Sequence, residues 1–241
     1  MSGESPILPV VFDRVSYDVD GAHLVKDFSA EFDTGERTII LGPNGAGKSL
    51  VLRLCHGLLP PTSGEVRWQG PGADKAAGRQ AMVFQRPITL RRSVAANLDY
   101  VLSLRKTPLK RRRAMVANAL TRAGLFDLRS RPARVLSAGE QQRLALCRAW
   151  ALEPEVLFLD EPTANLDPAA TRAVENMINA IHEGGAKIIM TTHDLGQARR
   201  LADDVIFMHQ GRLVERGPAE EFFERPRTAL AQAFLRGELL A

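Results

Sequence analysis

The chain has 241 residues, of which 45% are hydrophobic and 25% are charged. This composition is typical of a globular protein and excludes a largely disordered chain. The length fits one sizeable α/β domain with room for a small inserted subdomain. The net charge is +4. So mild a basic excess is compatible with phosphate-bearing ligands, nucleic acid or an anionic membrane, and it favours none of them over the others.

No targeting or membrane-spanning segment is expected. The first residues, MSGESPILPVVFDRV, lack the basic start and long hydrophobic stretch of a secretory signal. No hydrophobic run approaches the ~20 residues that cross a bilayer. We therefore expect a chain that is soluble by itself, so that any role at a membrane depends on a partner protein. Cys55 and Cys147 lie in hydrophobic helical patterns and are expected to be buried, reduced thiols.

The first predicted elements are antiparallel strands within residues 10–36, with a turn near DVDGA. Short runs rich in Val and Ile then predict strands at 37–42, 65–69, 80–84, 155–160, 186–192 and 204–209. The runs at 37–42, 155–160 and 186–192 are almost continuously hydrophobic, which is typical of parallel strands covered on both faces. Helical patterns lie at 47–57, 93–105, 109–123, 138–152, 168–183, 194–203 and 227–236. This alternation predicts an α/β fold with a mostly parallel central sheet.

Residues 86–135 interrupt the alternation, because they are helical in pattern, rich in arginine and without a convincing strand. We predict that they form a helical subdomain inserted into a single domain that takes up residues 1–241. The run KRRR at 110–113 lies in this insert. It is explained either by a solvated helix face or by contact with a partner or with anionic lipid.

The sequence GPNGAGKS at residues 42–49 matches the pattern G-x-x-x-x-G-K-[ST] between a predicted strand and a predicted helix, the context of a phosphate-binding loop. Glycines let successive backbone N–H groups converge, and the helix adds its positive N-terminal end. Lys48 would contact the β- and γ-phosphates, and the Ser49 hydroxyl would bind Mg²⁺. A glycine-rich turn would explain the glycines, but it does not explain why Lys48 and Ser49 stand at the positions that the pattern requires. The predicted nucleotide-binding residues of this segment are Gly42, Pro43, Asn44, Gly45, Ala46, Gly47, Lys48, Ser49 and Leu50.

Polar side chains follow three predicted strands. Asp160 and Glu161 end the run VLFLDEP, where Asp160 would hold Mg²⁺ through water and Glu161 would orient and deprotonate the attacking water. His193, in TTHD, would reach the γ-phosphate or the water from the opposite side. Gln85 ends QAMVFQ and would contact both Mg²⁺ and the water. Capping or solvation explains an isolated Asp-Glu pair, and a lone histidine is usually structural. Beside a phosphate loop, the sequence predicts Glu161, His193 and Gln85 as catalytic.

The segment LSAGEQQRLALCRA at 136–149 begins an amphipathic helix. Ser137 and Glu140 form the S-x-x-E pattern of a capping box, which explains both residues structurally. The same helix N-terminus is also suited to bind an anion, and Gly139 would let a phosphate approach closely. From the residues alone, both explanations stay open.

These segments, taken together, resemble the motifs of the ATP-binding cassette (ABC) ATPases. The order matches that family: Tyr17, GPNGAGKS, Gln85, LSAGE, LFLDEP, ANLD at 164–167 and TTHD, within residues 10–217. The resemblance implies a P-loop NTPase fold and hydrolysis of ATP with Mg²⁺. It also implies a head-to-tail homodimer, in which ATP lies between the phosphate loop of one copy and the signature of the other. The signature residues here are Ser137, Ala138, Gly139 and Glu140.

In the same family pattern, Asp167 would lie at the dimer seam and Tyr17 would stack on adenine. The chain departs from the usual signature LSGGQ at Ala138 and Glu140. Ala138 keeps its backbone N–H, and we expect the Glu140 carboxylate to point back to the helix cap. Leu50 stands where threonine is common. All proposed catalytic positions are filled, so we expect an active hydrolase.

Residues 85–104 resemble the coupling region of ABC importers, where the ATPase receives a short helix of the membrane subunit. The resemblance is closest to importers of oxyanions such as phosphate, molybdate or tungstate, with tungstate as the single best expectation. The implied partners are a membrane permease and an extracytoplasmic solute-binding protein, with the chain at the cytoplasmic face of the cell membrane. Two alternatives remain: a cassette of an exporter or lipoprotein-release system, and a non-transport cassette acting on DNA or ribosomes. The last class usually has a second cassette or long coiled coils, so no nucleic acid partner is expected.

Overall fold

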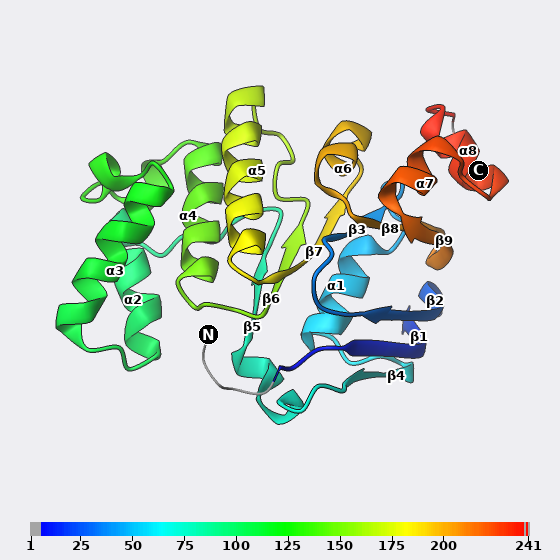
Figure 1. Cartoon of the computed structure of the whole chain (residues 1–241), viewed down its shortest axis with the longest axis horizontal. Helices are drawn as coiled ribbons and strands as arrows, with labels where there is room; N and C mark the ends of the chain where they lie inside the picture. Colours follow the sequence, from blue (N-terminus) through cyan, green and yellow to red (C-terminus); the bar gives the residue numbers. More distant parts are fainter. Residues whose placement is uncertain (1–5, 239, 241) are drawn as a thin grey trace.

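The computed structural model describes residues 6–238 and residue 240, and its strands form two sheets (Figure 1). The larger sheet has the order β5-β6-β7-β3-β8-β9. Its strands are β3 (Thr38–Leu41), β5 (Gln80–Val83), β6 (Val156–Asp160), β7 (Lys187–Thr192), β8 (Asp204–His209) and β9 (Arg212–Pro218). Neighbouring strands are parallel except β8 and β9, which are antiparallel. The mostly parallel sheet predicted from the sequence is confirmed, and β9 is an additional edge strand.

Alternate residues of the central strands contribute to two separate hydrophobic cores. Ile39, Leu157 and Ile188 pack into a core that extends over helices α2 (Val94–Leu104), α4 (Ala138–Trp150), α5 (Pro168–Glu183) and α6 (Leu195–Leu201). Ile40 and Phe158 face the other way, toward α1 (Lys48–His56) and the second sheet. Because both faces are covered, every residue of β6 and β7 is buried. This is the physical reason why these strands read as continuous hydrophobic runs.

The second sheet is antiparallel, with the order β2-β1-β4. It consists of β1 (Val10–Val19), β2 (Ala22–Phe32) and β4 (Ser63–Trp68). Asp20 and Gly21 join β1 to β2 with φ angles of 48° and 80°, as a two-residue hairpin turn with positive φ at both positions requires. The antiparallel strands predicted within residues 10–36 are therefore confirmed, and the strand predicted at 65–69 belongs with them as β4.

Residues 86–135, all of which the structure describes, contain no strand. They form α2, α3 (Leu109–Arg122) and the short 3₁₀ helices η2 (Phe126–Leu128) and η3 (Ala133–Val135), at the left of Figure 1. Another 3₁₀ helix, η1 (Ala73–Gly78), precedes β5. The C-terminal part contains α7 (Ala219–Glu224) and α8 (Ala229–Leu235), of which α8 lies within the helical pattern predicted at 227–236. Within the described residues, every helix is too short or too polar to traverse a lipid bilayer.

An ion pair joins the start of β3 to the loop before β8. Arg37 donates to Asp203 from its backbone N, from Nε and from Nη2, at 2.7, 2.9 and 2.8 Å. These hydrogen bonds from Arg37 lower the pKa of Asp203 from its ordinary value of 3.8. A carboxyl group with a lowered pKa stabilises the fold above its ordinary pKa, and this contribution is lost as the pH falls through the lowered value.

Asp203→Asn is therefore expected to lower the free energy of unfolding by about 1–2 kcal/mol at neutral pH. The difference from the unchanged protein should shrink as the pH falls below about 4, because both proteins then carry a neutral side chain at this position. Urea unfolding of the two proteins over a pH series measures it. A difference that stays constant at acid pH would show that the charge of Asp203 is not what stabilises this contact.

Candidate functional site

The loop between β3 and α1 is shaped by two glycines. A Cβ at Gly42 would overlap the carbonyl oxygen of Met208. A Cβ at Gly47, whose φ is 95°, would lie 2.9 Å from the carbonyl oxygen of Leu24. Only glycine fits these two positions without moving the backbone. Because α1 begins directly after Gly47, the positive end of the helix lies at the loop.

Lys48 is a buried cation directed into the site. It is only 5% exposed, and its Nζ donates to the carbonyl oxygens of Gly42 and Pro43 at 2.8 and 3.0 Å. Its Nζ also lies 3.6 Å from Oε1 of Glu161. Burial lowers the pKa of Lys48, and the carboxylates of Glu161 and Asp160 oppose this shift. The ammonium group is thus held among neutral carbonyls and one close carboxylate, where an additional anion would stabilise it.

Asp160 lies behind the loop at the carboxyl end of β6 and is only 3% exposed. Its Oδ1 accepts hydrogen bonds from Ser49 Oγ at 2.6 Å and from Thr191 Oγ1 at 2.8 Å. A hydroxyl and a carboxylate are the hard oxygen ligands that Mg²⁺ prefers. The residues present therefore fit a magnesium ion beside the phosphate loop, with Ser49 and Asp160 as the groups that would hold it.

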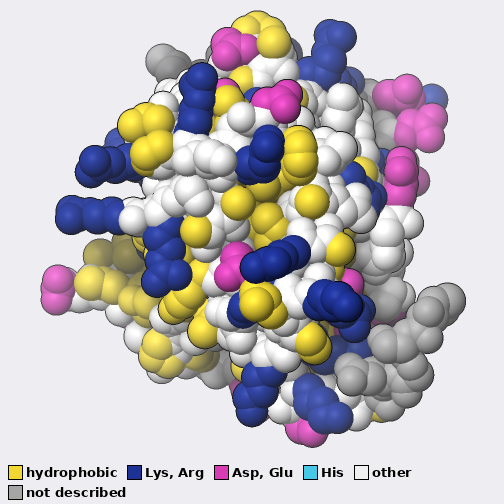
Figure 2. Space-filling model, turned by 90° about the vertical axis from the view of Figure 1, so that its left-hand side faces the viewer, with side chains coloured by type: hydrophobic (Ala, Val, Ile, Leu, Met, Phe, Trp, Pro, Cys, Tyr) yellow, Lys and Arg dark blue, Asp and Glu magenta, His cyan; other side chains and the backbone are white. Residues whose placement is uncertain are grey.

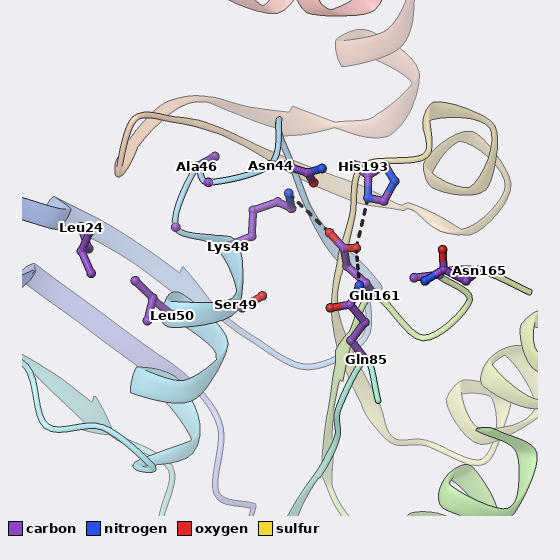
Figure 3. A pocket seen from close by; sticks show the side chains of 13 residues that line it. Leu24, Asn44, Ala46, Lys48, Ser49, Leu50, Gln85, Glu161, Asn165 and His193 are labelled. Atoms are coloured by element: carbon purple, nitrogen blue, oxygen red, sulfur yellow. Dashed lines mark hydrogen bonds and ion pairs between the residues drawn. The ribbon is translucent and has the colours of Figure 1, made fainter. Parts of the chain in front are cut away.

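Glu161 stands at the centre of the polar side chains in Figure 3. Its Oε2 lies 3.1 Å from Nδ1 of His193 and accepts a hydrogen bond from Nε2 of Gln85 at 3.4 Å (Figure 3). Its backbone N donates to Thr191 Oγ1 at 3.1 Å, and its φ of 45° lies in the left-handed region. A non-glycine residue in this region carries local strain, which surrounding contacts must hold. The backbone thus turns sharply after β6 and places the carboxylate between Lys48, Gln85 and His193.

These groups line one open cleft of about 680 Å³, a size suited to a small ligand such as a nucleotide. The residues along it are Leu24, Asn44, Gly45, Ala46, Gly47, Lys48, Ser49, Leu50, Gln85, Glu161, Ala164, Asn165 and His193. Gly42, Pro43 and Asp160 do not line the cleft, but they accept hydrogen bonds from Lys48 or Ser49, which do. The structure therefore brings together the loop residues and the predicted catalytic and metal-binding residues, although they come from separate segments of the chain.

Tyr17 is not among the residues that line the cleft. It pairs with Val25 across β1 and β2 and packs against the core beneath them. Leu24 lines the cleft instead and is 38% exposed. No local pattern marks Leu24 in the sequence, since its position at the cleft depends on how the second sheet packs over α1. A hydrophobic surface beside the phosphate loop is thus provided by Leu24 and Leu50, which Figure 3 shows on the same side of the cleft.

Ser137, Ala138, Gly139 and Glu140 do not line the cleft; they lie at the start of α4. The predicted capping box is confirmed: Glu140 N donates to Ser137 Oγ at 3.3 Å, and Ser137 N donates to Glu140 Oε2 at 2.8 Å. The Glu140 carboxylate therefore points back to the cap, as expected. Asp167 caps α5 by accepting from the backbone N of Ala169 and Ala170, each at 2.9 Å. These residues are a second cluster, separate from the cleft of the same chain.

Gly139 has a packing role that the sequence motif did not indicate. A Cβ at this position would lie 2.6 Å from the Cβ of Ala170, so α4 and α5 approach closely here. In an isolated helix, Gly→Ala would stabilise by about 1 kcal/mol. In this protein we expect Gly139→Ala to lower the free energy of unfolding by about 1–3 kcal/mol, because of the overpacking.

Urea unfolding measures the effect of Gly139→Ala. The double variant Gly139→Ala with Ala170→Gly is expected to recover most of the lost stability, since it removes the opposing methyl group. If the double variant is as unstable as the single one, the contact with Ala170 does not explain the glycine.

The fold and the cleft define an ATP-binding subunit of the ABC class. The chain belongs to the family described as ABC transporter, which matches residues 25–164. Proteins of this family hydrolyse ATP, generally with Mg²⁺, to drive transport. The chain is accordingly an ATP hydrolase coupled to transport.

Its relatives are ATPase subunits of importers. The phosphate import ATP-binding protein PstB 2 of Natronomonas pharaonis is 36% identical over 243 aligned positions, which cover 94% of this chain and 86% of the relative. The tungstate uptake system ATP-binding protein TupC of Peptoclostridium acidaminophilum is 38% identical over 196 positions, covering 81% and 90%. The solved structure of cbiO1 from Clostridium perfringens, part of the ABC transporter complex cbiONQ, has a TM-score of 0.79 at 32% identity and covers 97% of this chain and 96% of that one. Relatives named for methionine and arginine transport match at 35% and 33% identity. The likeness therefore extends to importers of chemically different solutes.

Proposed function

We propose that two copies of the chain bind ATP between them and power uptake of an oxyanion through a separate membrane permease. Each chain, residues 1–241, acts as one ATPase domain with residues 86–135 as an inserted helical subdomain. One observation supports the proposed dimer: the cleft of a single chain contains Lys48 and Glu161 but none of the signature residues 137–140. The site is thus incomplete until a second copy places its signature helix N-terminus, with Asp167 at the seam, over the nucleotide.

Within the cleft, each residue has a role that follows from its position. Lys48 binds the β- and γ-phosphates and exchanges its hydrogen bonds to the loop carbonyls for bonds to phosphate oxygens. Ser49 and Asp160 would hold Mg²⁺, which would neutralise phosphate charge. Glu161 accepts a proton from the attacking water. Gln85 and His193 contact the Glu161 carboxylate and so orient it toward the water, and Gln85 would also contact Mg²⁺. Leu24 and Leu50 provide the hydrophobic surface for the adenine, since Tyr17, the stacking residue expected from the family pattern, does not line the cleft.

A groove of about 430 Å³ between β5, α2 and α4 supports a permease contact. Ile88 lines it and is 72% exposed, which leaves a large hydrophobic side chain uncovered. Because Gln85 lies three residues before Ile88, docking in this groove is linked along the chain to the ATP cleft.

The likeness to phosphate and tungstate importers supports an oxyanion as the solute, with tungstate as the single best choice. In such a system the solute contacts the permease and an extracytoplasmic binding protein, while the ATPase lies at the cytoplasmic face of the membrane. The ATPase residues described above do not select the solute.

The test is purification of the chain with its native membrane partners, followed by reconstitution in vesicles. We expect a permease and a binding protein to co-purify, and ATP hydrolysis to rise when the binding protein carries tungstate, molybdate or phosphate. Stimulation by an amino acid alone would refute the oxyanion assignment. Recovery of the chain with ribosomes or nucleic acid, and without a permease, would refute the transport function.

A further inference from the structure

The helical insert concentrates the positive charge of the molecule. Residues 86–135 contain 13 of the 32 Lys and Arg residues and 2 of the 28 Asp and Glu residues. The insert therefore has a net charge of 13 − 2, or +11, whereas the whole chain has +4, which leaves −7 for all other residues. Figure 2 shows the face formed by the insert, where Lys and Arg side chains project between hydrophobic ones. Such an asymmetry within a domain indicates an anionic partner for this face.

The densest part is the corner between α2 and α3, residues 104–113, which we call the basic corner. It contains six cations and no acidic residue. Four of these residues are exposed and form no ion pair within the described chain: Lys106, Lys110, Arg111 and Arg113. Two of the cations do have partners: Arg112 pairs with Asp99 at 3.2 Å, and Arg105 donates to the carbonyl of Gly78 at 2.7 Å. These contacts hold the corner in place and leave four cations free to bind an anion.

The placement of these cations opposes local helix stability. Lys110, Arg111 and Arg112 lie in the first turn of α3, which has no acidic residue, and the N-cap Pro108 provides no side-chain hydrogen bond. The N-terminus of a helix carries partial positive charge, so cations there are unfavourable. Residues that lower local helix stability in this way indicate a functional site, where binding compensates for the lost stability. An anion bound at this corner would be attracted by the side chains and by the helix end together.

Two exposed leucines frame the cations. Leu104 and Leu109 are 65% and 54% exposed, on the last residue of α2 and the first of α3. Exposed hydrophobic side chains beside a polybasic cluster suit the boundary between lipid headgroups and acyl chains. Nucleic acid would instead favour aromatic side chains for stacking, and residues 104–113 contain none.

The corner lies beside the groove assigned to the permease. Val101 lines this groove, and Leu104 follows it one turn later on the same face of α2. Arg105 is bonded to Gly78, two residues before Gln80, which also lines the groove. This step rests on the proposed function: a subunit docked on a permease by this groove would turn the basic corner toward the bilayer.

We propose that the basic corner binds the surface of an anionic lipid bilayer, with Lys106, Lys110, Arg111 and Arg113 contacting phosphate groups and Leu104 and Leu109 entering the headgroup layer. The contact would hold the ATPase against the membrane independently of the permease. It is electrostatic in its main part, so raising the salt concentration weakens it.

The experiment is co-flotation of the full chain with vesicles that contain no protein. Vesicles of phosphatidylglycerol and phosphatidylcholine should bind the chain, and vesicles of phosphatidylcholine alone should not. The variant Lys110→Gln, Arg111→Gln, Arg113→Gln is expected to bind anionic vesicles about a hundredfold more weakly. Leu104→Ser with Leu109→Ser should also weaken binding, and the loss should persist at high salt.

A matched variant removes three exposed arginines elsewhere: Arg172→Gln, Arg212→Gln and Arg225→Gln. It changes the net charge equally and should bind vesicles normally. Thermal unfolding checks that both triple variants fold, and the corner variant is expected to be as stable as the unchanged chain or more so, since it relieves the helix N-terminus. Equal loss in the two triple variants, no loss in the corner variant, or tighter binding to DNA than to vesicles would overturn the proposal. The vesicles contain no permease, so this test is independent of the proposed function. If the chain binds vesicles but does not co-purify with a permease from its native membrane, only the proposed function is refuted.

Discussion

Glu161→Gln is expected to lower the maximal rate of ATP hydrolysis by about 10²–10⁴-fold while ATP binding is retained. The amide has the shape of the carboxylate but does not accept a proton from water. Lys48, Ser49 and the loop are unchanged, so the phosphate contacts remain. Removal of one negative charge 3.6 Å from Lys48 should leave ATP affinity equal or slightly higher. Phosphate release at saturating ATP measures the rate, and titration with a fluorescent nucleotide measures the affinity.

The same variant tests whether two copies are required. If the site closes only when a second chain covers the nucleotide, Glu161→Gln should accumulate as a dimer in ATP, visible by gel filtration, because hydrolysis no longer releases it. In the unchanged protein, activity per chain should rise with protein concentration. Glu220→Gln, at an exposed position of α7, is the matched control and should change neither property. Normal hydrolysis by Glu161→Gln would exclude this residue as the base.

The proposed catalytic groups could be predicted to converge because parallel strands end at one edge of their sheet. Asp160 of β6 pairs in register with Thr191 of β7. The segments that carry Gln85, Glu161 and His193 follow β5, β6 and β7, which are neighbours in the sheet. The motif spacing indicated which residues follow a strand. Because the carboxyl ends of parallel strands lie at one edge of the sheet, residues that follow neighbouring strands lie close together. The order of the strands was not needed to predict a cluster.

Other features depend on contacts between distant segments and are therefore harder to predict from the sequence. Leu24 reaches the cleft because β2 is linked to the phosphate loop through the β8–β9 turn, where Lys26 N donates to Gly211 O at 2.8 Å and Gly211 N donates to Ala46 O at 3.1 Å. The edge strand β9 has only one buried residue, Glu215, so no hydrophobic run indicated it. A usable signal did exist in the turn before it: Gln210 and Gly211 both have positive φ, as Asp20 and Gly21 do. A glycine at the second position of a two-residue turn predicts a hairpin.

Gly139 shows how one residue can meet two demands. The signature motif suggested that glycine admits a phosphate, whereas the structure shows that it also admits Ala170 of α5. A motif read only as a binding site therefore misses a packing constraint. The double variant with Ala170→Gly tests the packing demand by itself, because it restores space between the helices.

Lys48→Ala is expected to weaken ATP binding by about a hundredfold, as loss of charge-assisted hydrogen bonds worth about 3 kcal/mol implies. The effect on the free protein is expected to be small, because two terms oppose each other. Burial penalises the Lys48 cation, so its removal is favourable. Its loss also leaves the Glu161 carboxylate without its cation partner at 3.6 Å, which is unfavourable. Lys48→Met keeps the volume of the buried stem and separates the charge from the cavity that alanine creates.

Thermal unfolding with and without Mg²⁺ and ATP distinguishes binding from folding. The unchanged protein should be stabilised by the nucleotide, since a ligand that binds only the folded state raises its stability. Both Lys48 variants should unfold near the temperature of the free protein and gain little when ATP is added. Lys26→Met, at a half-buried lysine of β2 away from the cleft lining, should keep the full nucleotide-induced shift. If Lys48→Met keeps that shift as well, the loop amides alone bind the triphosphate and the ammonium group is dispensable.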